Sequence, residues 1–179
     1  MNRFLNRLIR AAKLDVSLYQ EIIEDAGTLN QALIVVLIYS MAVGYGSFGR
    51  AGAIGANIGM ITTLLGWYVW AFSTYIVGAR MLPEARIQPD RKALLRVMGF
   101  ASAPGILRVL GFIPGFGIVV LLAAAGWMIA AATVGVKQAL NYESTARALG
   151  VCIIGLIISA VFQGLLIIML FSAFGVASK

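Results

Sequence analysis

Residues that could carry chemistry are few and widely spaced in this sequence. It has no histidine, which removes the most common general base and the most common metal ligand together. Its one cysteine, Cys152, lies inside a long apolar run, where a buried and unreactive thiol is expected. We find no nucleophile paired with a base and no phosphate-binding loop. The sequence therefore predicts no catalytic, cofactor-binding or metal-binding residues, and a protein that is not an enzyme.

One glycine motif, Gly44-x-Gly46-x-x-Gly49, has the spacing of a dinucleotide-binding fingerprint. That fingerprint follows a strand and is completed by an acidic residue about twenty positions later. Here the motif follows an apolar helical run, and the next acidic residue is Glu84. We interpret the motif as a glycine-rich turn between two helices, and we expect no nucleotide cofactor.

Three polar side chains lie deep within apolar segments. Arg96 and Arg108 are separated by eleven uncharged residues, too few for a helix to cross a hydrocarbon core of roughly 30 Å. If the segment that contains them crosses the membrane, we expect the Arg96 and Arg108 side chains to reach opposite membrane–water interfaces. Gln163 is predicted to hydrogen-bond a neighbouring helix. The acidic residues all lie outside the apolar runs, so proton-coupled transport has no obvious carrier.

The composition indicates a membrane protein. Hydrophobic residues make up 61% of the chain and the mean hydropathy is +0.94, whereas soluble domains are about 45–50% apolar. The net charge of +7 could suggest nucleic acid, but the basic residues lie between apolar runs, where they set membrane orientation. We expect membrane lipids as partners and no nucleic acid.

The apolar runs predict an all-α, polytopic fold with about five transmembrane helices. Four runs carry no charge: 26–49, 51–79, 109–136 and 148–178. The segment 91–112 is charged and contains Pro104, so it is either a span broken at 101–104, with Asp90 as its N-cap, or a re-entrant hairpin. A topology of five spans, with the N-terminus in the cytoplasm and the C-terminus outside, obeys the positive-inside rule better than the hairpin does.

The first 28 residues predict a cytoplasmic segment that precedes a transmembrane domain of residues 29–175. Residues 3–14 have the pattern of an amphipathic helix lying in the membrane interface. The acidic stretch that follows carries an apolar stripe, and Thr28-x-x-Gln31 is typical of a capping box. We expect an exposed surface for a protein partner, with these candidate docking residues: Asp15, Tyr19, Glu21 and Ile22.

A family resemblance appears in the broken segment. Gly99-Phe100-x-x-x-Pro104 resembles the Gly-aromatic-x-x-x-Pro signature in the third span of the Yip family, five-span membrane proteins that interact with Rab GTPases. The stretches LDVSLYQEIIED and GFASAPGILRVLGFIPGFG look most like prokaryotic members. The resemblance implies a bacterial or archaeal plasma membrane protein whose partners are other proteins or further copies of itself.

Two functions follow as hypotheses. The first is a non-enzymatic membrane scaffold or adaptor, in membrane organisation or trafficking, which the resemblance and the lack of catalytic groups favour. The alternative is a small transporter, channel or lipid-handling protein, which the broken third helix favours, because discontinuous helices build binding sites at membrane depth.

Overall fold

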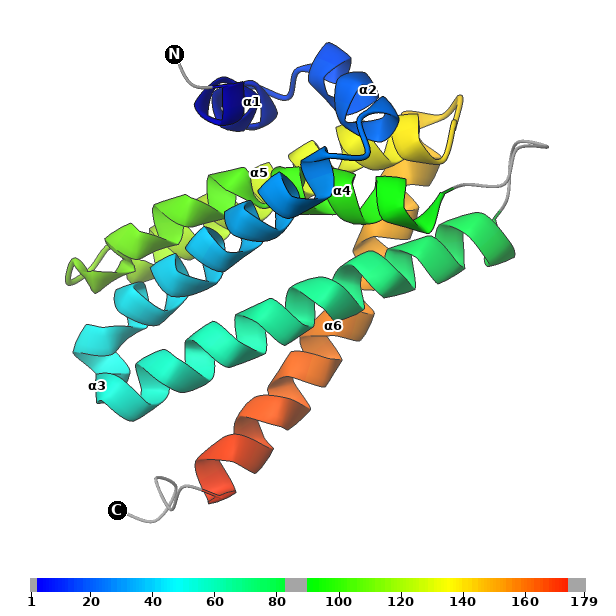
Figure 1. The fold of residues 1–179 in the computed structure, drawn as a ribbon. Helices are drawn as coiled ribbons and strands as arrows, with labels where there is room; N and C mark the ends of the chain where they lie inside the picture. Colours follow the sequence, from blue (N-terminus) through cyan, green and yellow to red (C-terminus); the bar gives the residue numbers. More distant parts are fainter. Residues whose placement is uncertain (1–2, 83–89, 174–179) are drawn as a thin grey trace.

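The computed structural model describes residues 3–82 and 90–173, and this part of the chain is helical and without strands. In chain order the elements are α1 (Arg3–Ala12), α2 (Val16–Glu24), α3 (Thr28–Ile76), η1 (Val77–Met81), α4 (Arg91–Ala101), η2 (Ala103–Phe112), α5 (Gly117–Ala139) and α6 (Thr145–Ala173). Five segments are long and apolar enough to cross a membrane: Thr28–Gly49, Ala51–Met81, Arg91–Phe112, Gly117–Ala139 and Thr145–Ala173. The expected all-α polytopic architecture is therefore confirmed (Figure 1).

The first two spans are the two arms of α3, joined by a sharp turn at Gly52. Its φ of 61° and ψ of −167° lie in a region that only glycine occupies readily. The arms then pack closely, since a Cβ atom on Gly44 would lie 2.9 Å from the carbonyl oxygen of Ala56. The glycine-rich stretch therefore serves a helical hairpin. We call the end of the bundle with this turn the Gly52 end, and the opposite end the Thr28 end.

The third segment crosses the bundle instead of turning back. Near the Thr28 end, a Cβ on Gly99 would lie 2.7 Å from the Ala32 side chain. Near the Gly52 end, a Cβ on Gly111 would lie 3.4 Å from the carbonyl oxygen of Gly46. The third span therefore runs parallel to the first along its length, which excludes the re-entrant hairpin.

The predicted break in this span is present. The α-helix ends at Ala101, and a 3-10 helix with Pro104 in its first turn runs on from Ala103. Pro104 has no backbone N–H to continue the α-helical ladder. A 3-10 helix rises about 2.0 Å per residue and an α-helix about 1.5 Å, so the combined segment covers about 36 Å, enough to cross a core of about 30 Å.

The predicted helix caps have mixed outcomes. Asp90 accepts the backbone N–H groups of Lys92 and Ala93, as expected for an N-cap. The capping box at Thr28 is wrong, because the Thr28 hydroxyl donates to the carbonyl oxygen of Asp25 at 2.7 Å and Gln31 accepts from Arg7. The connector 83–89 and the predicted domain end at residue 175 lie outside the described residues.

Candidate functional sites

Helices α1 and α2 form what we call the N-terminal clasp, residues 3–25, packed against the side of the bundle. Their apolar faces join a buried cluster with the first and third spans: Ala11, Leu18, Tyr19, Ile22, Ala32, Val35, Val97, Phe100 and Ala103. The indole N–H of Trp127 on α5 donates to the carbonyl oxygen of Ala12 at 2.8 Å and fixes the end of α1. The clasp is therefore part of the folded core.

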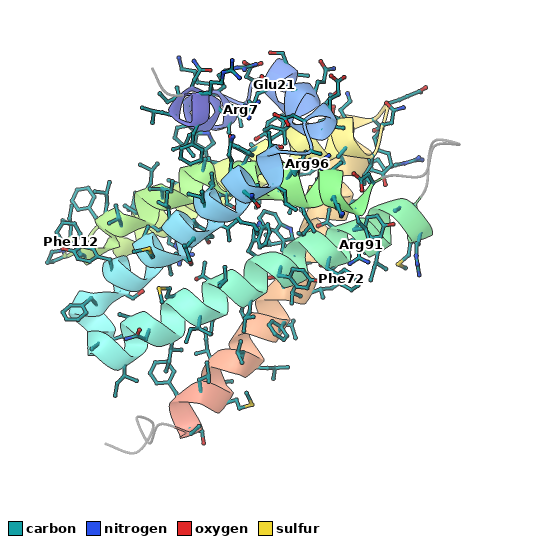
Figure 2. All side chains as sticks on the ribbon, in the orientation of Figure 1. Arg7, Glu21, Phe72, Arg91, Arg96 and Phe112 are labelled. Atoms are coloured by element: carbon teal, nitrogen blue, oxygen red, sulfur yellow. The ribbon has the colours of Figure 1, made fainter. Side chains whose placement is uncertain are left out.

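Two arginines of α1 hold the clasp together through three carboxylates (Figure 2). Arg7 contacts Glu21 at 2.7 Å and Asp25 at 3.0 Å. Arg10 contacts Asp15 at 2.8 Å and Glu21 at 2.8 Å. Residues 3–14 were expected to form an amphipathic helix in the membrane interface, and the fold turns the two arginines of this helix toward acidic side chains of the clasp.

The network shifts the pKa values of its members. Hydrogen bonds from Arg10 and Ser17 lower the pKa of Asp15 to about 2. Hydrogen bonds from Arg10 and Arg7 lower the pKa of Glu21. Both carboxylates are therefore ionised at neutral pH, and their role in the structure is to pair with arginine.

Arg96 connects the clasp to the third span. Its side chain is nearly buried, with the residue 4% exposed, and donates to the carbonyl oxygens of Ile22 at 2.9 Å and Ile23 at 2.6 Å. These carbonyls lie at the end of α2, where a helix leaves acceptors unpaired and a cation is favourable. Helix α2 covers the Arg96 side chain, which therefore finds its partners within the fold (Figure 2).

The structure corrects the predicted docking residues. Tyr19 and Ile22 have no exposed surface, since their side chains fill the clasp core against the bundle. A Cβ on Gly135 would collide with the Tyr19 ring, so α5 approaches this side chain closely. Asp15 and Glu21 are partly exposed but engaged by arginine. All four residues gather in the clasp as a structural brace.

The three residues of the family motif, Gly99, Phe100 and Pro104, shape and pack the third span. Gly99 allows the third span to approach Ala32, and Phe100 is fully buried in the clasp cluster. Pro104 lies where the helix type changes. The motif therefore specifies how the third span packs beneath the clasp, rather than a reactive site.

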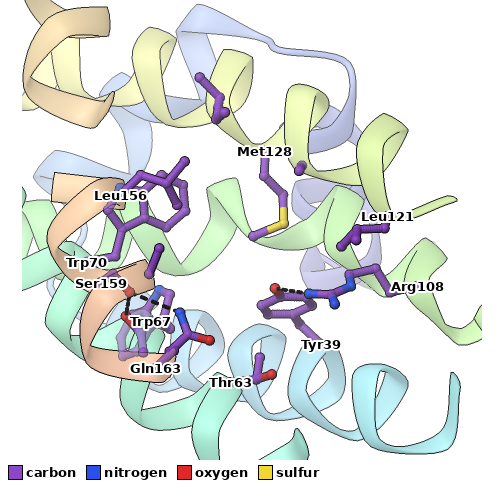
Figure 3. A pocket seen from close by; sticks show the side chains of 14 residues that line it. Tyr39, Thr63, Trp67, Trp70, Arg108, Leu121, Met128, Leu156, Ser159 and Gln163 are labelled. Carbon is purple, nitrogen blue, oxygen red and sulfur yellow. Dashed lines mark hydrogen bonds between the residues drawn. The ribbon is translucent and has the colours of Figure 1, made fainter. Parts of the chain in front are cut away.

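A second region is a cavity of about 290 Å³ between the spans, which we call the Arg108 cavity (Figure 3). It is lined by Tyr39, Thr63, Gly66, Trp67, Trp70, Arg108, Leu121, Ala125, Met128, Ile129, Leu156, Ser159, Ala160 and Gln163. Mostly apolar walls with a few polar groups are typical of ligand sites, whose volumes run from about 300 to 1,000 Å³.

Arg108 does not extend to the interface as expected. Its guanidinium donates to the Tyr39 hydroxyl at 3.2 Å, at the middle of the first span. A Cβ on Gly46 would collide with the Arg108 carbonyl oxygen, so the backbones are in close contact there. The arginine therefore points into the cavity and toward the bundle interior (Figure 3).

Gln163 also differs from its prediction. Its amide donates to Ser159 at 3.1 Å on its own helix, and the Ser159 hydroxyl donates to the Gly66 carbonyl oxygen at 2.6 Å on the second span. The side chain rests on Gly66, where a Cβ would collide with it. Gln163 thus reaches the neighbouring helix through Ser159 and by packing.

Sequence reasoning missed both Tyr39 and Trp67 as cavity residues. Trp67 is 6% exposed, and its mid-span position was the available signal. Tyr39 gave no signal, because its partner Arg108 is 69 residues away in the chain. The fold alone brings these groups together.

With this geometry established, the chain can be placed among known proteins. It is a polytopic helical membrane protein, and the family model described as the Yip1 domain matches residues 16–177. The match covers most of the sequence, and the chain belongs to the Yip1 domain family. A search of curated proteins and a search of solved structures each found no significant match.

Proposed function

We propose that this protein is a non-enzymatic membrane adaptor that binds a protein partner on the outer surface of the clasp. The observation that carries the proposal is a set of apolar side chains exposed on a firmly held element: Leu5 at 45%, Ile9 at 39% and Val16 at 45%. Tyr19 and Ile22 fix the element from below, which makes Leu5, Ile9 and Val16 the docking surface in their place.

Charge favours protein over lipid headgroups as the occupant. Residues 3–25 contain four basic and four acidic residues, so the clasp carries no net charge. Basic amphipathic helices bind membranes through several unpaired Lys or Arg residues facing anionic lipids. Arg7 and Arg10 are already paired, which weakens that attraction. An apolar surface with balanced charge suits a protein interface, whose core is depleted of charge.

Photo-crosslinking in native membranes tests the proposal. A photoreactive amino acid at Ile9 should yield a protein adduct of one defined mass, and Leu5→Glu on the same face should reduce its yield several-fold. The matched control is Ile168 on the fifth span, 69% exposed and expected to face lipid. Adducts with lipid alone at Ile9, or equal protein adducts at both positions, would contradict the adaptor. An adduct of twice 19.1 kDa identifies a second copy as the partner.

We also propose that the Thr28 end faces the cytoplasm of a bacterial or archaeal cell. Described basic residues gather at that end: Arg91, Lys92, Lys137 and Arg147. The positive-inside rule then orients the protein. With Cys152 replaced by alanine, a cysteine at Glu143 should be labelled from the cytoplasm and one at Ala53 from outside. Labelling of both from one side contradicts the orientation.

A specific observation favours the alternative function, handling of a lipid or small molecule. Arg108 places a cation inside a cavity between membrane spans, and polar groups at such depth often mark substrate pathways.

A further inference from the structure

Arg108 forms no ion pair with any residue that the structure describes. It is the one charged residue among the described residues that line the cavity. Its partner there is the neutral Tyr39 hydroxyl, which takes one of the five N–H donors of a guanidinium. An arginine in a membrane span is unfavourable when it is left unpaired, so such residues normally pair with another group or mark a functional site. An anionic ligand would complete this site.

A second donor lines the same cavity. The Trp67 indole N–H is buried and finds no hydrogen-bond acceptor among residues 3–82 and 90–173, whereas the neighbouring Trp70 donates to the Cys152 carbonyl oxygen at 3.0 Å. An unpaired buried donor is unfavourable, and an acceptor that enters the cavity can supply the missing partner. Two independent observations, an uncompensated cation and an orphan donor, therefore point to a ligand with acceptor oxygens.

The cavity has its charged residue toward one end of the bundle and apolar walls toward the middle, as a membrane lipid has its headgroup and its chains. Arg108 and Leu121 lie within two turns of the Gly52 end of their helices, while Trp70 and Leu156 lie closer to the Thr28 end. A lipid in the leaflet at the Gly52 end has its headgroup on that side and its chains toward the middle of the membrane. Leu121 and Ala160 are exposed on α5 and α6, so the cavity opens sideways between these spans.

We propose that the Arg108 cavity binds an anionic phospholipid from the leaflet at the Gly52 end. A phosphate oxygen accepts from the Arg108 guanidinium, which suits phosphate geometry. One acyl chain lies along Trp67, Met128 and Leu156, and the volume of about 290 Å³ leaves the second chain in the bilayer. The site is independent of the adaptor proposal, because the clasp surface and this cavity lie on different elements.

Native mass spectrometry tests the site on the full chain. The protein is reconstituted in bilayers of equal parts phosphatidylcholine and phosphatidylglycerol, then extracted and weighed with its retained lipid. We expect one phosphatidylglycerol with about a tenfold preference, the size of one charge-assisted contact. Arg108→Gln should abolish the preference, and Arg108→Lys should keep part of it. Lys137→Gln, which removes a charge at the Thr28 end, should leave it unchanged.

A second variant separates the lipid site from a folding effect and from a free-phosphate site. Ala125→Phe fills the cavity while Arg108 stays intact, and it should expel the chain and the bound lipid. Inorganic phosphate at millimolar concentration should not displace the lipid. The proposal is overturned if Arg108→Gln or Ala125→Phe retains phosphatidylglycerol as the wild type does, or if inorganic phosphate displaces it. The crosslink at Ile9 should be unaffected by either variant, so failure of the lipid site and failure of the adaptor proposal can be told apart.

Discussion

The clasp and the Arg108 cavity both depend on arginine, and they use it differently. In the clasp, Arg7 and Arg10 are each bonded to two carboxylates, and their charges are balanced within the fold. In the cavity, Arg108 has a neutral phenol as its partner. Arg96 lies between these cases, because its main partners are backbone carbonyls at the end of α2.

The difference separates structure from function. A cation whose partners lie within the chain contributes to stability. Such a cation has few free hydrogen-bond donors and little unbalanced charge to offer a ligand. A cation at membrane depth without a counter-charge carries a cost that a ligand can offset. Substitutions in the clasp should therefore lower stability, whereas substitutions at Arg108 should change what the protein binds.

The largest effect is expected from Tyr19→Ala. The side chain is fully buried between the clasp, the third span and α5, and truncation of such an aromatic costs about 3–5 kcal/mol. Thermal unfolding in detergent should show the loss, and limited proteolysis should release α1 and α2. Leu5→Ala, on the exposed face of the clasp, is the control and should leave both measurements unchanged. If Tyr19→Ala leaves the clasp protected, the clasp is not part of the folded core.

Arg96→Gln should follow, with a loss of about 3 kcal/mol, because two backbone acceptors at the end of α2 lose charged hydrogen bonds. Hydrogen exchange should rise in α2 before it rises in the spans. Lys92→Gln serves as the control, since Lys92 is exposed in the first turn of α4. Equal effects of the two substitutions would show that Arg96 acts through general charge and not through the α2 carbonyls.

Gly99→Ala is expected to cost about 1–3 kcal/mol, the range for overpacking. The added Cβ would lie 2.7 Å from the Ala32 side chain and 3.0 Å from its carbonyl oxygen, so the first and third spans must separate. Gly126→Ala is a matched control in a helix with nothing within 4 Å of the new Cβ. It should be neutral or stabilising by up to about 1 kcal/mol, from helix propensity. The measurement is the unfolding temperature of the two variants. Equal values for Gly99→Ala and Gly126→Ala would show that the close approach at Gly99 does not contribute to stability.

Much of this fold could be predicted from the sequence, because length and hydropathy determine whether a segment crosses a membrane. The break at Pro104 and the cap at Asp90 were also predictable, since both are local. The burial of Tyr19 was not. An apolar stripe on a polar segment has the same pattern whether it docks onto a partner or onto its own bundle, and only the tertiary fold distinguishes the two.

The cavity shows the same limit. Arg108 was visible as a charge in an apolar segment, but its direction was not, because Tyr39 lies in a different span. The length of the third span was underestimated, since a 3-10 helix is longer per residue than an α-helix. Sequence reasoning identified the polar residues correctly and could not say which would find partners.

The smallest effect concerns the pH dependence of the clasp. The pKa of Asp15 is lowered from 3.8 to about 2, so its ion pair stabilises the folded state fully above pH 3.8 and this contribution is lost as pH falls toward 2. The pKa of Glu21 shifts in the same direction.

Asp15→Asn should remove part of this pH dependence and cost about 0.5–1 kcal/mol at neutral pH, because the Asp15–Arg10 pair is partly exposed. Hydrogen exchange of α1 between pH 5 and pH 2 measures it, with Lys13→Gln as a control that leaves the Arg10 pairs intact. If α1 loosens equally in the Asp15→Asn protein, carboxylates other than Asp15 carry the pH dependence of the clasp, and the contribution assigned to the Asp15–Arg10 pair is wrong.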